Sequence, residues 1–542
     1  MSRFFIVLIF LIGITINFQT MGQGLPIDSL DNNYLNWHNK DFSFDGIPGT
    51  SVERVYLELI KDKKPKKEII VAIIDSGVEL DHEDLQGNIW TNEDEIPGNG
   101  IDDDNNGYID DIHGWNFIGS KNGENVNYET LEYTRIYRKY KPKFEKVLSP
   151  SEVEEAEARE YADFLRAEKL YQKELTKRKE EKTAIDKFAF IFDRAKQIIE
   201  DATGTTPNTL SDLEKVNSTD PKVNGAKQFL EERYNNGFTE HELINYRKYI
   251  DLYLTMHLNL QFNPREIIGD NPEDFDDRDY GNNNVQGERA DHGTSVAGVI
   301  AATRNNQVGI DGIASVKIMA IRSVPHGVEY DKDVALAIEY AVNNGASIIN
   351  MSFGKDLSPQ KEFVDRAVKL AEEKNVLLVH GSGNDGANID IQPNFPTNVY
   401  LDGTKAKNWI TVGASGSTIN EDLPAFFSNY GQESVDIFAP GVQILSLDTA
   451  SLYGLHDGTS LSAPVVSGIA ALVWSYYPEL TAVELKEVLL NSSTQINKPK
   501  IHQPTENDKK KKVKFKTLSV SGGIVNAYQA FLEAEKRINR RQ

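Results

Sequence analysis

Three residues of the types that cooperate in nucleophilic catalysis lie far apart in this sequence. Asp75 follows a short apolar run, and His292 and Ser460 each stand where a helix is predicted to begin. A serine hydroxyl is a weak nucleophile and needs an adjacent base. A histidine takes the serine proton and later gives it to a leaving amine, while a carboxylate holds the imidazole in one tautomer. These residue types predict acyl transfer by a serine, provided that the fold brings the three side chains together.

Ser460 lies between a turn-rich segment and an apolar helix predicted over residues 463–477. The first N–H groups of a helix have no partner inside it, and the positive end of the helix suits an oxyanion. Pro464 fits this position if the helix begins near Leu461, because proline is tolerated in the first turn. An isolated serine here is more often a plain helix cap, so the aspartate and the histidine elsewhere are what favour catalysis.

Asp75 follows residues 68–74 (EIIVAII), a β-branched run typical of a strand buried on both faces, as in a parallel sheet. Open α/β sheets place ligands and catalysis at the carboxyl ends of such strands. A simple turn aspartate is the alternative.

The remainder of the chain alternates strands and helices of about 10–15 residues, which predicts an α/β fold with a doubly wound, mostly parallel sheet flanked by helices. The further strands are expected at residues 317–322, 346–351, 376–379, 409–414 and 435–439. The helices are expected at residues 295–302, 332–344, 361–375, 463–477 and 482–491.

Between the aspartate and the histidine, charged and aromatic residues recur at helical spacing with few β-branched runs, which predicts an α-helical insertion. Its helices are expected at residues 154–182, 184–200, 226–234 and 240–258. The predicted organisation is a signal peptide (1–22), an N-terminal extension (23–66), the α/β domain (67–122 and 266–535) and the insertion (123–265).

The N-terminus has the features of an export signal. Ser2 and Arg3 give a short positive start, residues 4–16 are apolar but too short to span a membrane, and small residues precede Gln23. The sequence therefore predicts cleavage before Gln23 and a mature chain, periplasmic or secreted, without a transmembrane anchor.

Charge and composition exclude several classes of partner and chemistry. The formal net charge is −23, which argues against nucleic acid and for a soluble, self-repelling surface. The chain has no cysteine, which excludes disulfides, a thiol nucleophile and a cysteine-ligated zinc. Serine acyl transfer by the three residues needs no cofactor. The sequence leaves the oligomeric state undetermined.

An acidic segment resembles the first half of a calcium-binding loop, with Gly107 supplying the sharp turn. The glutamate that closes an EF-hand is missing, since its place is His113, so Asp110 or Asp111 would close the site. The expected ligands, by side chain or by carbonyl, are Asp102, Asp104, Asn106, Tyr108 and Asp110. Such a calcium ion would be structural, and a solvated acidic turn is the alternative.

Four motifs together resemble those of the subtilisin-like serine peptidases, the subtilases. They are residues 75–77 (DSG), 292–298 (HGTSVAG), 382–384 (SGN) and 458–464 (GTSLSAP). The order Asp, His, Ser is also that of subtilisin. The resemblance covers residues 68–117, 280–495 and 522–527, and it departs from many relatives at Ser295, where they have a second histidine.

This resemblance implies an endopeptidase that acts on proteins or peptides. Asp75, His292 and Ser460 would form the catalytic triad, and Asn384 would donate to the oxyanion together with the N–H of Ser460. The resemblance implies that an extended substrate pairs with a strand edge and enters a side-chain pocket. The residues implied for substrate binding are Ser352, Phe353, Gly354, Gly381, Ser382 and Gly383. His380 is expected to be a histidine packed in the protein interior and not a catalytic one.

Two other functions remain open from the sequence. One is a catalytically silent subtilase fold that serves as a binding module. The other is a peptide-processing or peptide-ligating enzyme whose insertion restricts its substrates.

Overall fold

The computed structural model describes residues 36–505 and 511–541, so the predicted signal peptide lies outside the described residues. The described chain divides into two compact units, residues 133–263 and residues 36–132 with 264–541. The smaller unit lies within the predicted insertion. Residues 123–132 belong instead to the larger unit, where the N–H of Val126 donates to Ile118 O and Asn127 accepts from Arg322.

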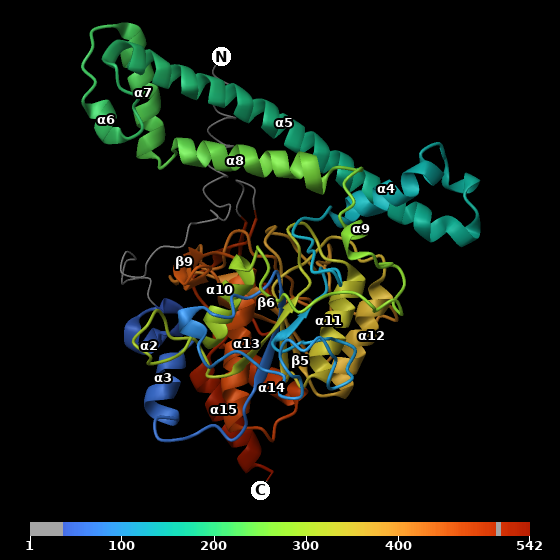
Figure 1. The fold of residues 1–542 in the computed structure, drawn as a ribbon. Helices are drawn as coiled ribbons and strands as arrows, with labels where there is room; N and C mark the ends of the chain where they lie inside the picture. Colours follow the sequence, from blue (N-terminus) through green and yellow to red (C-terminus); the bar gives the residue numbers. More distant parts are fainter. Residues whose placement is uncertain (1–35, 506–510, 542) are drawn as a thin grey trace. The chain divides into compact units, whose positions relative to one another are not determined.

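A nine-stranded sheet forms the centre of the larger unit, in the order β10-β13-β7-β6-β5-β4-β1-β3-β2. Two of its strands, β5 and β6, are labelled in Figure 1. All neighbouring pairs are parallel except β10 with β13. The strands are β1 (Ile70–Asp75), β2 (Gly114–Asn116), β3 (Lys317–Arg322), β4 (Ile348–Met351), β5 (Leu377–Gly381), β6 (Trp409–Ser415), β7 (Ile437–Pro440), β10 (Thr494–Gln495) and β13 (Gly523–Ile524). The predicted mostly parallel sheet is confirmed.

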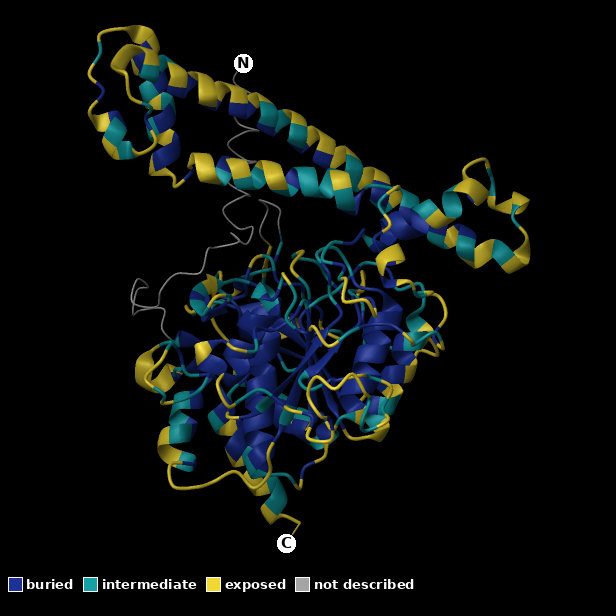
Figure 2. Ribbon diagram, in the orientation of Figure 1, coloured by how far each residue is buried: buried dark blue, intermediate teal, exposed yellow. Residues whose placement is uncertain are grey.

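Helices cover both faces of this sheet and bury a core on each side, drawn in dark blue in Figure 2. One core contains α10 (Asp291–Ala301), α13 (Thr459–Tyr476), α14 (Ala482–Asn491) and α15 (Ala527–Asn539). The other contains α11 (Asp331–Asn343) and α12 (Lys361–Glu373). This is the doubly wound α/β arrangement that the sequence predicts. The short helices of this unit are α2 (Phe42–Asp45), α3 (Val52–Arg54) and α9 (Arg265–Ile268).

Helix α13 runs through the middle of this unit. It is the one helix in the described part of the chain that is long and apolar enough to span a membrane, but 94% of it is buried inside the protein. Its composition is that of a core helix.

A two-stranded antiparallel hairpin, β8 (Ile444–Asp448) and β9 (Leu452–His456), precedes α13 and packs on α10. The sequence analysis did not predict it. A second small pair, β11 (Ile501–His502) and β12 (Lys512–Val513), lies near the C-terminus.

The N-terminal extension is partly folded onto the larger unit. Trp37, Val52 and Val55 are buried in its first core, and Trp37 Nε1 donates to Gln443 O at 3.0 Å. Residues 55–59 form a single π-helical turn.

The smaller unit is helical, as predicted, and has its own core, which includes Phe188, Phe192 and Leu230. Its helices are α5 (Ala158–Thr203), α6 (Leu210–Glu214), α7 (Pro221–Asn235) and α8 (Glu240–Leu252), and most of α4 (Glu132–Phe144) also belongs to it. The sequence analysis expected two helices, 154–182 and 184–200, where the structure has the single α5 of 46 residues. Thr183 lies inside this helix, and its hydroxyl donates to Lys179 O, four residues earlier, at 2.9 Å.

Candidate active site

The site residues lie at the carboxyl ends of adjacent parallel strands. Asp75 is the last residue of β1, Ser352 follows β4, and Gly381 ends β5. Ile74 is level with Met351, and Met351 with His380. The three chain segments that leave these strands therefore start side by side, at the edge where parallel sheets place their ligands.

Asp75 and His292 form a direct pair. Asp75 Oδ1 accepts hydrogen bonds from His292 Nδ1 and from the N–H of Ser76, both at 2.7 Å. An ionised carboxylate only accepts, so Nδ1 carries the proton and Nε2 is the basic atom. Gly293 permits the approach, because a Cβ there would lie 2.0 Å from Gly77 O. This is the geometry expected of the aspartate and the histidine of a catalytic triad.

The surroundings of this pair shift the pKa of the histidine. Burial by itself lowers the pKa of His292, but the charge and hydrogen bond of Asp75, and then the charge of Asp291, raise it above the usual 6.5. The side chain of His292 is 28% exposed and that of Asp75 is 2% exposed. The carboxylate is thus shielded from water while the imidazole remains accessible to a substrate.

Ser460 is the second residue of α13. Its N–H lies in the first turn and has no partner within the helix, so it is available to an anion. Gly458 precedes the helix with φ 148°, and a Cβ there would lie 2.8 Å from Ser460 Oγ. Glycine at this position therefore leaves room for the hydroxyl.

Pro464 lies deeper in this helix than the sequence analysis expected. The helix begins at Thr459 instead of near Leu461. In a regular helix the backbone N–H of residue 464 would donate to the carbonyl of Ser460, four residues earlier. Proline has no N–H. The hydroxyl of Ser352 replaces it and donates to Ser460 O at 2.9 Å.

Asn384 is exposed and is held by Thr459. Its Oδ1 accepts from the N–H of Thr459 at 2.9 Å and from Thr459 Oγ1 at 3.0 Å, and Nδ2 donates to no described residue. A Cβ at Gly458 would lie 2.8 Å from Ser460 Oγ and 3.5 Å from Asn384 Nδ2. Both atoms therefore face the same small space, as an oxyanion donor and its nucleophile must.

No hydrogen bond joins His292 Nε2 to Ser460 Oγ within the described residues. Their helices, α10 and α13, pack against each other in the core (Figure 1). In structures without substrate such catalytic hydrogen bonds are often long and tighten only in the substrate complex. The structure thus joins Asp75 with His292 and places Ser460 near Asn384, while the central contact of the triad is a prediction.

The sequence model of the subtilase family matches residues 66–514. The chain belongs to this family. The thermophilic serine proteinase of Bacillus sp. (strain AK1) is 38% identical over 204 residues, which are 37% of this chain and 46% of that protein. Subtilisin BL of Lederbergia lenta is 35% identical over 213 residues, which are 39% of this chain and 73% of that protein.

This subtilase spans about half the length of some curated relatives, 46% of the Bacillus proteinase and 52% of M-protease from Shouchella clausii (strain KSM-K16). A similar solved structure is that of the prenylagaramide maturation protease PagA. It is 29% identical with a TM-score of 0.36, and the likeness covers 45% of this chain and 82% of that one.

The segment expected to pair with substrate is fixed on one side and open on the other. Ser352 contacts the backbone of Ser460, as described, and Phe353 O accepts from His380 Nε2 at 2.7 Å. Burial lowers the pKa of His380 to about 4, although this hydrogen bond raises it. No described residue hydrogen-bonds to the N–H or C=O of Gly354. His380 is thus a neutral, packed histidine that orients the segment, and Gly354 is available to a peptide.

The glycine-rich wall at residues 381–383 depends on two residues that the sequence analysis missed. Asn429 Nδ2 donates to Ser382 O at 3.0 Å, and Ser382 Oγ donates to Asn429 O at 3.0 Å. Thr459 Oγ1 accepts from the N–H of Gly383 at 3.1 Å. Thr459 could have been found from its place beside Ser460, but no local pattern marks Asn429.

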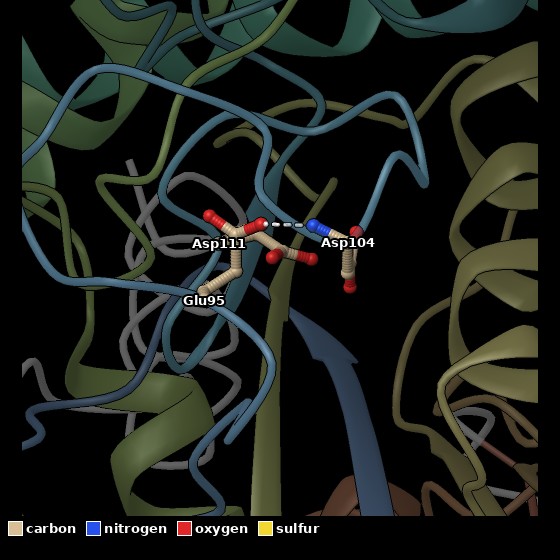
Figure 3. A group of neighbouring side chains, drawn as sticks. All are labelled: Glu95, Asp104 and Asp111. Carbon is tan, nitrogen blue, oxygen red and sulfur yellow. Dashed lines mark hydrogen bonds between the residues drawn. The ribbon is translucent and has the colours of Figure 1, made fainter.

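Three carboxylates converge at the predicted calcium loop. Oxygens of Glu95, Asp104 and Asp111 lie within 4.8 Å of one another. Figure 3 shows the three side chains and the hydrogen bond from the N–H of Asp104 to Glu95 Oε1, 3.2 Å long. Burial raises the pKa of Asp111 to about 6, against hydrogen bonds from Tyr340, Asn92 and Asn106 that lower it. Carboxylate oxygens in this number suit a hard cation such as calcium.

The ligand set differs from the predicted one. Asp110 has φ 53°, and its carboxylate turns away to accept from the N–H groups of Gly98, Asn99 and Gly100. Asp111, the alternative to Asp110 in the sequence analysis, lies in the carboxylate cluster. Glu95 lies outside the motif, so the loop pattern gave no signal for it.

The other predicted ligands mostly stabilise the turn. Asp102 accepts from the N–H groups of Asn106 and Gly107, and Asn106 Oδ1 accepts from the N–H of Tyr108. Only Asp104 of the predicted set lies in the three-carboxylate cluster.

Proposed function

We propose that this subtilase is a serine endopeptidase that hydrolyses peptide bonds of proteins through an acyl-enzyme on Ser460. The observation that carries the proposal is the pair of Asp75 and His292, with Nδ1 bound to the carboxylate at 2.7 Å and Nε2 left as the base. The names of the relatives, serine proteinase and subtilisin, support it.

In the proposed reaction His292 Nε2 takes the proton of Ser460 as the hydroxyl attacks the substrate carbonyl. Asp75 stabilises the imidazolium, which its charge already favours. The oxyanion accepts from Asn384 Nδ2 and the N–H of Ser460, and His292 then protonates the leaving amine. Water repeats the steps in the same site and releases the acid product.

Casein hydrolysis by the purified mature protein tests the proposal, with Ser460→Ala as the matched control. The endopeptidase account expects activity in the native protein and its loss in the variant. Equal hydrolysis by both proteins would overturn it, and a folded native protein without activity on any protein substrate would favour the silent binding module.

We also propose that the protein is exported and cut before Gln23. The support is the charged start, the apolar run of residues 4–16 and the small residues that precede Gln23. N-terminal sequencing of the protein from the extracytoplasmic fraction tests it, because retention of Met1 would contradict export by a cleaved signal.

A structural calcium ion is proposed at Glu95, Asp104 and Asp111. The convergence of three carboxylates supports it, since a divalent cation would relieve their mutual repulsion. Its role would be to hold the loop of residues 95–111.

A further inference from the structure

The chain leaves the larger unit after Glu132 and re-enters it at Pro264. Within the larger unit, buried ion pairs fix the chain at both places. Both sets of ion pairs involve the first turn of α11, where Asp331, Lys332 and Asp333 are consecutive and buried.

The first cluster is centred on Lys355. Its Nζ lies 2.7 Å from Glu132 Oε2, 2.9 Å from Asp331 Oδ1 and 2.9 Å from Glu329 O. The side chains of Lys355, Glu132 and Asp331 are 2%, 6% and 3% exposed. A lysine with this environment has little freedom to move.

The second cluster holds the returning chain. Arg265 lies 2.5 Å from Asp333 and 2.6 Å from Asp270, and Lys332 Nζ lies 2.7 Å from Asp270. Tyr280 OH also donates to Asp333, at 2.6 Å. This cluster is as buried as the first, but its lysine is part of α11 and is not adjacent in the chain to the expected substrate segment.

Lys355, in contrast, directly continues that segment. Its N–H and C=O both pair with the backbone of Phe395, at 2.9 Å each. Gly354 is packed so tightly beside Asn394 that a Cβ would lie 2.5 Å from its amide, and Asn394 Nδ2 donates to Ser382 O at 3.2 Å. The position of Lys355 thus sets the spacing between the two walls expected to bind the substrate, residues 352–354 and 381–383.

Burying an ion pair is a costly way to gain stability, because desolvation of the charges offsets their attraction. Such pairs serve better to specify one arrangement of the groups that they join. Here the joined groups are those of Glu132 and Lys355. Glu132 is the last residue of the larger unit before the chain leaves it, and Lys355 follows the substrate segment.

We propose that Lys355 is a positioning residue for the substrate-pairing segment 352–354, and that Glu132 makes this position depend on the root of the insertion. The inference rests on the proposed peptidase function. It predicts that the pair affects the binding of extended substrates and leaves the reactivity of Ser460 unchanged.

The experiment compares Glu132→Gln and Lys355→Met with the matched control Lys332→Met, which removes an equally buried lysine from the second cluster. Two readouts separate the roles. The first is the rate of labelling by a small fluorophosphonate without a peptide, which reports the triad. The second is the gain in kcat/KM when a peptide substrate is extended from one to four residues before the cut.

We expect Glu132→Gln and Lys355→Met, the two pair variants, each to lose about tenfold or more of this gain. Misplacement of a substrate by about 1 Å costs up to about a hundredfold in rate. Labelling should remain within about twofold of the native rate, and Lys332→Met should keep the full gain. Folding of each variant is checked by circular dichroism. If Lys355→Met does not fold, the test of the positioning role rests on Glu132→Gln and Lys355→Arg.

Folded pair variants that keep the full gain, or a control that loses as much as they do, would overturn the inference. A native protein that is neither labelled nor active would instead refute the proposed peptidase function, so the two failures are distinguishable.

Discussion

Ser352 Oγ donates a hydrogen bond to the carbonyl of Ser460 at 2.9 Å. The carbonyl needs this donor because Pro464, four residues later in α13, has no N–H. Ser352 in turn accepts from Asn350 Nδ2 at 2.9 Å, so a chain of buried polar contacts connects β4 with the start of α13. Ser352, the first residue of the expected substrate segment, thus contacts the start of the helix that carries Ser460.

Replacing Ser352 by alanine should destabilise the protein by about 1–3 kcal/mol, the cost of leaving a buried carbonyl without a donor. Denaturant unfolding measures the change. The substitution Pro464→Ala offers the matched test, because alanine supplies the missing N–H. In the Pro464→Ala background, Ser352→Ala should cost clearly less. Equal costs in both backgrounds would show that the hydroxyl does not stand in for the N–H.

Asn384→Ala should lower kcat by about 10²- to 10³-fold, the effect known for loss of one oxyanion donor in subtilisin. KM should change little, because the donor acts on charge that develops in the transition state. The buried N–H of Thr459 loses its acceptor at the same time, so the melting temperature should also fall. A large rise in KM at constant kcat would instead assign Asn384 to substrate binding.

His292 should titrate above pH 6.5 in the Ser460→Ala protein, because its pKa is raised by Asp75. Below this pKa the imidazole is protonated and cannot act as a base, so peptidase activity should fall as the pH falls through it. Adding Asp75→Asn removes the charge and should lower the midpoint, as followed by NMR of the imidazole. His380 and His456, each with a pKa lowered to about 4 by burial, provide internal controls that should not titrate in this range. An unchanged His292 midpoint in the double variant would contradict the pairing.

Removal of calcium by a chelator should lower the melting temperature of the native protein. A site filled at 100 times its Kd contributes about 2.7 kcal/mol. Asp104→Asn should abolish the dependence on calcium. Asp110→Asn should destabilise the loop yet retain the dependence, since its carboxylate binds the N–H groups of residues 98–100. A native melting temperature that changes with neither chelator nor added calcium would rule out the ion.

The sequence predicted the central strands and the order of elements well, and the reason is physical. Strands buried on both faces, such as β1 and β3, are continuous apolar runs that local sequence shows directly. The hairpin of β8 and β9 was missed because its last strand is only partly buried and includes Gly454 and His456. Its pairing is a tertiary feature that periodicity does not encode.

The sequence predicted those site residues whose own side chains take part in the chemistry. The resemblance to the subtilase motifs implied that Asp75 and His292 are partners, and the structure joins them. It could not reveal that Ser352 supports the helix of Ser460, since that contact spans 108 residues. At the acidic loop, the backbone conformation of Asp110 decided which carboxylate turns inward, and a motif contains no such information.

The most direct test of the account is labelling with a fluorophosphonate, followed by mass spectrometry of the modified peptide. The account predicts one label, on Ser460, loss of casein hydrolysis in proportion to labelling, and no label in the His292→Ala protein. A correctly folded native protein that remains unlabelled, or that is labelled equally well without His292, would contradict the claim that Asp75, His292 and Ser460 act as a triad.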